Sequence, residues 1–169
     1  MNAEFSRLRV SRRQRGFFLI EALVAILILA LGILGLVAMG GTAVSAQSDS
    51  QYRAEASNLA DSIAAQIAVG VDRSASGTLQ ASLAAFAHQA SGAASSCAFG
   101  GNPSTIVPIT ALVDRAANAS SAPGLPGATR VDQQIAIDTA VFNRVAITLC
   151  WQTPDDRVKR RHTLVTYVN

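Results

Sequence analysis

The chain of 169 residues is half hydrophobic, only 5% aromatic and 15% charged, which bounds it to one modest globular unit together with a strongly apolar segment. Its formal net charge of +3 and pI of 9.4 would suggest a nucleic-acid or acidic-lipid partner, but the charge is unevenly placed. Five of the 14 basic residues lie in the first 16 positions beside a single acid, and the remaining charges nearly balance. The average charge therefore neither identifies nor excludes a partner for the rest of the chain.

An apolar segment runs from Phe17 to Met39 and carries one charge, Glu21. As a helix it would span about 35 Å at about 1.5 Å per residue, which is enough for the roughly 30 Å hydrocarbon core of a bilayer. Arginines precede this segment, and the next basic residue is Arg53. The positive-inside rule therefore predicts a cytoplasmic N-terminus and an exported remainder.

A secretory signal peptide has the same order of basic and apolar residues, and the small residues between Ala38 and Ala46 could supply its cleavage site. Glu21 argues against that interpretation, because a carboxylate deep in lipid costs about 2.5 kcal/mol or more. A plain signal anchor with a stray glutamate is the second alternative, and it would explain the hydropathy and the topology.

The start of the apolar segment resembles the cleavage motif of type IV prepilins, in the residues Arg15-Gly16-Phe17-Phe18-Leu19-Ile20-Glu21. The resemblance implies that a membrane-embedded prepilin peptidase cuts between Gly16 and Phe17 on the cytoplasmic side, and that the new terminal Phe17 is N-methylated. A glycine fits this role, since it has no side chain to obstruct the approach of a protease to the backbone. Phe18 departs from the family pattern, in which a small or hydroxyl residue is common at that position.

The same resemblance gives Glu21 a role in assembly. Within a fibre, Glu21 of one subunit would lie near the terminal amine of a neighbour's Phe17, so that an isolated charge in apolar surroundings becomes an ion pair. We therefore expect Glu21 to act as an assembly carboxylate.

Beyond Gly40 and Gly41 the segment becomes amphipathic, because apolar side chains recur at steps of three or four and charged ones fall between them. The apolar positions are Tyr52, Ala56, Leu59, Ile63 and Ile67. With Gly70 as a candidate C-cap, the pattern predicts a single helix from about Phe17 to about Val69. Gly32, Gly35, Gly40 and Gly41 weaken its interior, and we interpret them as sites of close membrane-helix contact or as points where the helix bends.

The second half of the chain carries two short helical patterns and then strand signals. The first helical pattern is Leu79, Leu83 and Phe86, and the second is Ile109, Leu112, Val113 and Ala116. The first strand pattern is Val131, Gln133, Ile135 and Ile137, and the second is Val145, Ile147, Leu149 and Trp151. A turn at Pro154 then leads into a last strand, which ends with Leu164 to Val168. The predicted fold class is α+β and pilin-like, with a long N-terminal helix packed on a small antiparallel sheet. The predicted segments are a cleaved leader (1–16), a transmembrane and fibre-packing half-helix (17–42), an amphipathic half-helix (43–70) and a periplasmic head (71–169).

Cys97 and Cys150 are the two cysteines of the chain, and the predicted topology places both in the oxidising periplasm. A disulfide between them would tie the irregular middle of the chain to a strand. Two unpaired buried thiols are the alternative.

No constellation of residues indicates an enzyme, a cofactor site or a metal site. His88 and His162 are far apart in the sequence, and we interpret His88 as a solvated or capping residue and His162 as part of a strand. The cations Arg157, Lys159, Arg160 and Arg161 form the one basic cluster of the exported part. A charged edge strand that resists aggregation is the favoured interpretation, and contact with nucleic-acid phosphates or with an acidic neighbour is the alternative.

Further motifs narrow the resemblance to minor pilins of the PilV type, the type IV pilus modification proteins. They are Gly32-Ile33-Leu34-Gly35-Leu36, Ala56-Ser57-Asn58-Leu59-Ala60-Asp61, Leu125-Pro126-Gly127 and the strand ending at Trp151. The resemblance implies a structural subunit that is held in the inner membrane, then joins other minor pilins and the major pilin in a complex that starts or caps a pilus. A type II secretion pseudopilin and an adhesive or DNA-binding tip module are the alternatives.

Overall fold

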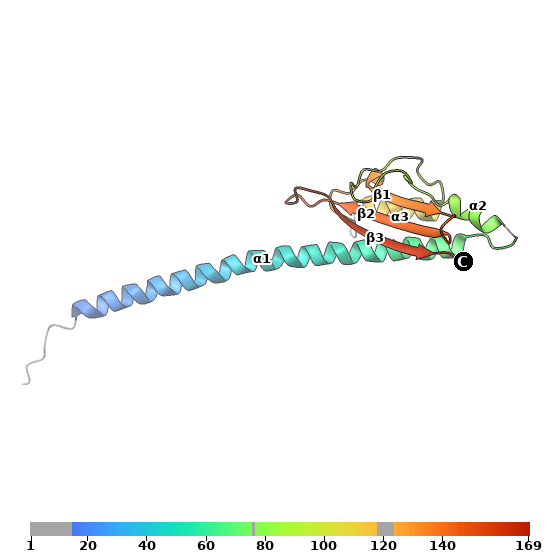
Figure 1. The fold of residues 1–169 in the computed structure, drawn as a ribbon. Coiled ribbons are helices and arrows are strands. Elements are labelled where there is room, and N and C mark those ends of the chain that lie inside the picture. Colours follow the sequence, from blue (N-terminus) through green and yellow to red (C-terminus); the bar gives the residue numbers. More distant parts are fainter. Residues whose placement is uncertain (1–14, 76, 118–123) are drawn as a thin grey trace, which may run out of the picture. The chain divides into compact units, whose positions relative to one another are not determined.

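The computed structural model describes residues 15–75, 77–117 and 124–169, and the chain divides into two compact units, Met1–Gln47 and Ser48–Asn169. Helix α1, Arg15–Gly70, supplies all of the described structure of the first unit and the first element of the second. The second unit adds α2 (Thr78–Ala84), α3 (Val107–Ala117), the short 3-10 helix η2 (Arg130–Asp132) and three strands (Figure 1). The predicted α+β class, a long apolar helix followed by a small antiparallel sheet, is confirmed.

The sheet has the order β1-β2-β3, with β1 at Gln133–Asp138, β2 at Arg144–Trp151 and β3 at Arg160–Tyr167. Both neighbouring pairs are antiparallel, with Ile135 opposite Ile147 and Ile147 opposite Leu164. The predicted turn at Pro154 connects β2 to β3, and β3 lies at an edge of the sheet, as expected for the basic strand.

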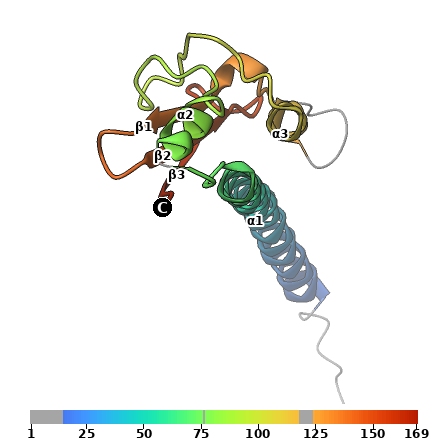
Figure 2. The same ribbon diagram turned by 90° about the vertical axis from the view of Figure 1, so that its right-hand side faces the viewer.

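The core of the second unit lies between one face of this sheet and the helices α1 and α3 (Figure 2). The predicted apolar face of α1 is confirmed, since Ala56, Leu59, Ile63 and Ile67 are fully or almost fully buried and Tyr52 is half-buried. From the sheet, alternate residues of β2 point into the same core: Val145, Ile147, Leu149 and Trp151. An ion pair between Arg115 and Glu55 joins α3 to α1 beside the core.

Helix α1 ends at Gly70, and the ring of Phe86 packs against its last turn. A Cβ atom on Gly70 would lie 2.8 Å from the ring carbon Cζ of Phe86, so a larger residue would displace that ring. The chain then turns through Asp72, whose carboxylate accepts a 2.8 Å hydrogen bond from the backbone N–H of Ser74. That hydrogen bond holds the pKa of Asp72 below its usual range.

One strand prediction is wrong at its first residue. Val131 was expected to share a face of the first strand, but it lies in η2 and is exposed. The cause is local: the carboxylate of Asp132 accepts hydrogen bonds from the backbone N–H of Thr129 at 3.1 Å and from its hydroxyl at 2.7 Å. This closed turn starts the strand at Gln133 instead.

Candidate functional site

The N-terminal half of α1 presents large apolar side chains to the outside along its whole length. Every large apolar residue from Phe17 to Met39 is exposed, and α1 is the one helix among the described residues that is long and apolar enough to cross a membrane. Burying so much apolar surface requires lipid or a neighbouring molecule. The segment therefore fits membrane anchoring followed by incorporation into a fibre.

The residues of the cleavage motif lie in the first turns of α1. Residues 1–14 of the predicted leader lie outside the described residues, while Gly16 and Phe17 are helical and Phe17 is exposed. Glu21 is exposed as well, and the described side chains of the chain offer it no ion pair. Its expected partner, the terminal amine of another subunit, would have to come from outside this chain.

Four glycines of α1, unlike Gly70, have no packing role within the described chain. A Cβ atom at Gly32, Gly35, Gly40 or Gly41 would meet no other atom within 4 Å. Glycine weakens a helix interior by about 1 kcal/mol relative to alanine, so the stability of this helix does not explain the glycines. Close packing of a second helix does explain them, because small residues let two helix backbones approach each other.

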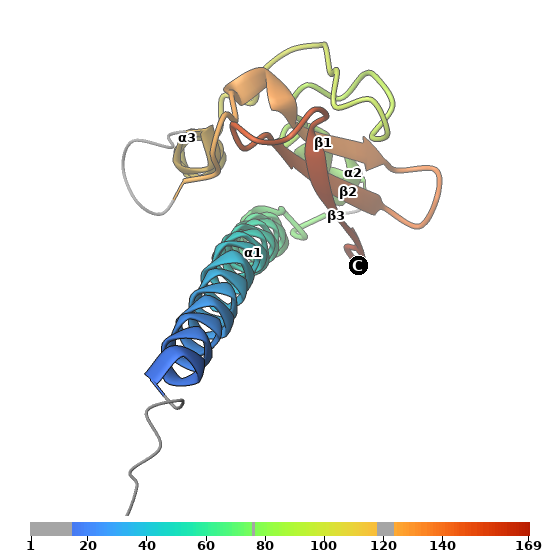
Figure 3. The ribbon, with the colours of Figure 1, turned by 90° about the vertical axis from the view of Figure 1, so that its left-hand side faces the viewer.

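In the head, a disulfide joins Cys97 to Cys150, as the sequence predicts, with the two Cα atoms 6.0 Å apart. The segment that carries Cys97 crosses the face of the sheet opposite α1 (Figures 2 and 3). The amide of Gln134 also holds this segment, by donating to the carbonyls of Gln89, Ser91 and Gly92 at 3.2 to 3.3 Å. The segment from Gln89 to Cys97, which carries no periodic pattern of its own, therefore covers the outer face of the sheet.

His88 is a second anchor of the same segment, and the prediction that it is solvated is wrong. Its side chain is only 2% exposed. The ring atom Nε2 lies 3.0 Å from the carbonyl of Arg130, and Nδ1 accepts a 3.1 Å hydrogen bond from the N–H of Ser104. The backbone of His88 also pairs with that of Ile135 in β1. Both ring nitrogens are therefore used to fix the connection between α2 and α3 to the sheet.

We expect His88→Ala to lower the free energy of unfolding by about 2 kcal/mol, because the N–H of Ser104 and the carbonyl of Arg130 lose their partner in a buried site. Denaturant unfolding followed by the fluorescence of Trp151, which is the only tryptophan and is buried, measures the change. His162→Ala, at a half-buried position on the edge strand, is the control and should change stability much less. Equal effects of the two variants would refute the anchoring role of His88.

The predicted basic cluster is mostly engaged by acceptors of this chain. Arg160 binds both oxygens of Asp156 at 2.7 Å and also pairs with Asp49 of α1. Lys159 pairs with the buried carboxylate of Asp132.

The remaining two cations of the cluster differ from each other. Arg161 donates to the carbonyl of Ser95 at 3.2 Å, so it helps to hold the segment around Cys97. Arg157 is exposed, and the described residues offer it no ion pair. Two of the four cations, Lys159 and Arg160, are therefore paired with carboxylates, and Arg160 joins β3 to α1 through Asp49.

The described residues hold no group of three or more His, Cys, Asp or Glu side chains that could bind a metal ion. The anchors at His88, Gln134 and Asp132 were missed in the sequence because each pairs with backbone or with residues distant in the chain. No periodic pattern marks such partners.

Comparison with known proteins identifies the N-terminal segment. The prokaryotic N-terminal methylation motif matches residues 11–37, which include Gly16, Phe17 and Glu21. No curated protein and no solved structure shows significant similarity to the chain. The motif implies processing by a prepilin peptidase and assembly with other pilins. Together with the long apolar helix and the small antiparallel sheet, it supports placing the chain in the type IV pilin-like class.

Proposed function

We propose that the chain is a minor pilin, a structural subunit that enters a minor-pilin complex at the start or tip of a type IV pilus. Before assembly it is held in the inner membrane by the segment 17–42, with the head 71–169 in the periplasm. Processing removes residues 1–16, and Phe17 is then N-methylated. A nucleic acid is the less favoured partner, since three of the four cations of the basic cluster already contact this chain.

The observation that carries the proposal is the methylation motif at the start of a helix whose large apolar side chains from Phe17 to Met39 are all exposed. An anchor alone needs the apolar run, but it has no use for a glycine, a phenylalanine and a glutamate at these spacings. A subunit that is processed and then packs against neighbours uses all three. The disulfide supports the periplasmic position of the head, because disulfides persist in oxidising compartments.

Cleavage after Gly16 is the first expectation to test. We expect the protein, expressed together with a prepilin peptidase, to begin at an N-methylated Phe17, and Gly16→Leu to remain uncut and anchored, because a side chain there obstructs access of the protease to the backbone. Intact-mass measurement of membrane fractions distinguishes the two products. Gly32→Leu, at a glycine with open space around it, is the matched control and should be processed normally.

An intact leader in the wild-type protein, or a new terminus between Ala38 and Ala46, would contradict the assignment. The second result would instead indicate a secretory signal peptide.

A type II secretion pseudopilin is the rival within the same class, and it would be processed in the same way. Affinity purification of the tagged chain from cells that make both systems separates the two. Recovery of pilus subunits supports the minor-pilin role, and recovery of secretion-system subunits supports the rival.

A further inference from the structure

The middle of α1 combines several features that allow a helix to bend. Gly40 and Gly41 are adjacent, and the hydroxyl of Ser45 donates a 3.3 Å hydrogen bond to the carbonyl of Gly41. A serine that bonds the carbonyl four residues earlier weakens and often bends a helix, and glycine and serine together are a recognised cause of sharp kinks. The serine hydrogen bond sets these two glycines apart from Gly32 and Gly35. We call Gly40, Gly41 and Ser45 the hinge.

Tertiary packing gives the hinge little support. Residues 43–47 are exposed, and the boundary between the two compact units falls between Gln47 and Ser48. Within the described part of α1, Ala56 is the first fully buried residue. Most of the stability of a protein helix comes from the packing of a buried face, so the helix is weakest where the hinge lies.

Two ion pairs hold the next stretch of α1, Ser48 to Glu55, which contains no fully buried residue. Asp49 pairs with Arg160 at the start of β3, and Glu55 pairs with Arg115 of α3. The stretch is therefore attached to two different elements of the head before its apolar face begins. We call these two ion pairs the stop.

The arginine of the first pair is held in place before it reaches α1. The Nε and Nη2 atoms of Arg160 donate to the two carboxylate oxygens of Asp156 at 2.7 Å, and Asp156 accepts a 2.8 Å hydrogen bond from the hydroxyl of Thr153. Nη1 is then directed at Asp49. A guanidinium that is already fixed by a bidentate contact loses little further freedom on binding a second carboxylate.

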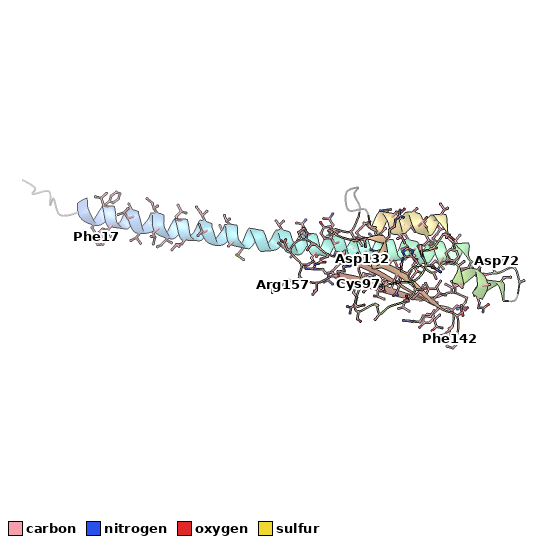
Figure 4. All side chains as sticks on the ribbon, turned by 90° about the horizontal axis from the view of Figure 1, so that it is seen from above. Phe17, Asp72, Cys97, Asp132, Phe142 and Arg157 are labelled. Carbon is pink, nitrogen blue, oxygen red and sulfur yellow. A yellow bond between two sulfur atoms is a disulfide. The ribbon has the colours of Figure 1, made fainter. Side chains whose placement is uncertain are left out.

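We propose that α1 bends at the hinge and that the stop prevents the bend from spreading into the head. The first pair of the stop lies at the end of the head where α1 enters. In Figure 4, Arg157, which lies in the turn before β3, is at the opposite end of the head from Asp72, which follows α1. A hinge is a few residues that absorb a backbone change while the flanking parts move as rigid bodies. The membrane half of α1 can then change its angle to the head while the core stays closed.

Distances between two spin labels, measured by pulsed electron paramagnetic resonance on the purified full-length chain in detergent, test the hinge. Leu34→Cys and Gln51→Cys place the labels at exposed positions on either side of it, and the native cysteines do not react because they are joined. A straight helix gives one narrow distance of about 25 Å, and bending adds shorter distances.

Replacing both Gly40 and Gly41 with alanine should lower the fraction of shorter distances about fivefold for each glycine, because alanine favours the helical backbone. A Cβ atom has open space at both positions, so the substitutions add no clash. Gly32→Ala is the matched control. It lies outside the labelled interval, also in open space, and should leave the distances unchanged.

A second pair of labels, Gln51→Cys with Val131→Cys in η2, tests the stop, because it reports the distance from this stretch of α1 to the head. Asp49→Asn should raise the fraction of displaced distances about two- to fivefold, the range expected for a partly exposed ion pair. Salt at about 1 M should act on the wild type in the same direction, since it shortens the Debye length to about 3 Å. Arg53→Gln is the matched control, because Arg53 pairs with the same carboxylate from within the helix.

A wild-type distance distribution across the hinge that is as narrow as the one between residues 51 and 131 overturns the hinge. So does a distribution that the double alanine variant leaves unchanged. The stop is overturned if Asp49→Asn displaces the helix no more than Arg53→Gln does. The buried Trp151 reports by its fluorescence that the head of each variant is folded. These measurements need neither cleavage nor pilus subunits, so their failure would leave the proposed function standing.

Discussion

Replacing Cys97 and Cys150 together with alanine is expected to lower the free energy of unfolding of the head by about 4 kcal/mol. The disulfide closes a long interval, with a sequence separation of 53, so its loss gives the unfolded chain many more conformations. In the folded head, the segment around Cys97 would keep its attachments at Gln134 and His88. We therefore expect lower global stability with a native fold.

Denaturant unfolding of the full chain, followed by the fluorescence of Trp151, measures this loss. Ser95→Ala is the matched control in the same segment, because its carbonyl, which accepts from Arg161, is retained. Hydrogen exchange should rise around Cys97 and stay low in the buried turns of α1 near Leu59 and Ile63. Unchanged denaturant midpoints, or free thiols in the unfolded and unreduced wild-type protein, would refute the prediction.

Long periodic segments could be predicted from the sequence because the side-chain pattern alone decides which face of a helix or strand is buried. The apolar face of α1 from Ala56 to Ile67 is one example, and the inward face of β2 from Val145 to Trp151 is another. Both faces are buried against an adjacent layer of the head. They can therefore be predicted without knowing which residue each side chain contacts. The disulfide between the two cysteines could also be predicted, since the predicted topology puts both in one oxidising compartment.

Features that depend on individual hydrogen bonds, and not on a periodic side-chain pattern, could not be predicted in the same way. Val131 fails as a strand residue because a carboxylate one position later closes a turn. His88 is buried because two backbone groups distant in the sequence, at Ser104 and Arg130, converge on its ring.

The basic cluster illustrates the same limit for charge. Its cations are adjacent in the sequence, but their acceptors come from a helix, a 3-10 helix, the segment around Cys97 and the turn before β3. Asp49 and Asp132 are two of these acceptors. A run of charges therefore predicts a charged surface only when the positions of the opposite charges are known.

Replacing Glu21 with leucine is expected to separate membrane retention from assembly. An anchor gains nothing from a carboxylate in its apolar helix, so Glu21→Leu should be retained in the membrane as well as the wild type or better. A subunit that docks against the amine of a neighbour's Phe17 loses its charge partner, and removing one member of a desolvated pair costs about 3 kcal/mol or more. Cleavage after Gly16 should be unaffected, because the cleaved bond lies several residues before the substitution.

The measurement is the amount of Glu21→Leu recovered in sheared pilus fractions, or with other minor pilins, relative to its amount in membranes. A loss of 3 kcal/mol corresponds to a decrease of about 100-fold in an equilibrium constant, so the variant should be nearly absent from the assembled fraction. Ser45→Leu, at an exposed position of α1 outside the motif, is the control for added apolar bulk and should assemble more nearly like the wild type. If Glu21→Leu assembles as well as this control, the exposed carboxylate has no docking partner. The helix would then function as an anchor in which Glu21 contributes nothing to assembly.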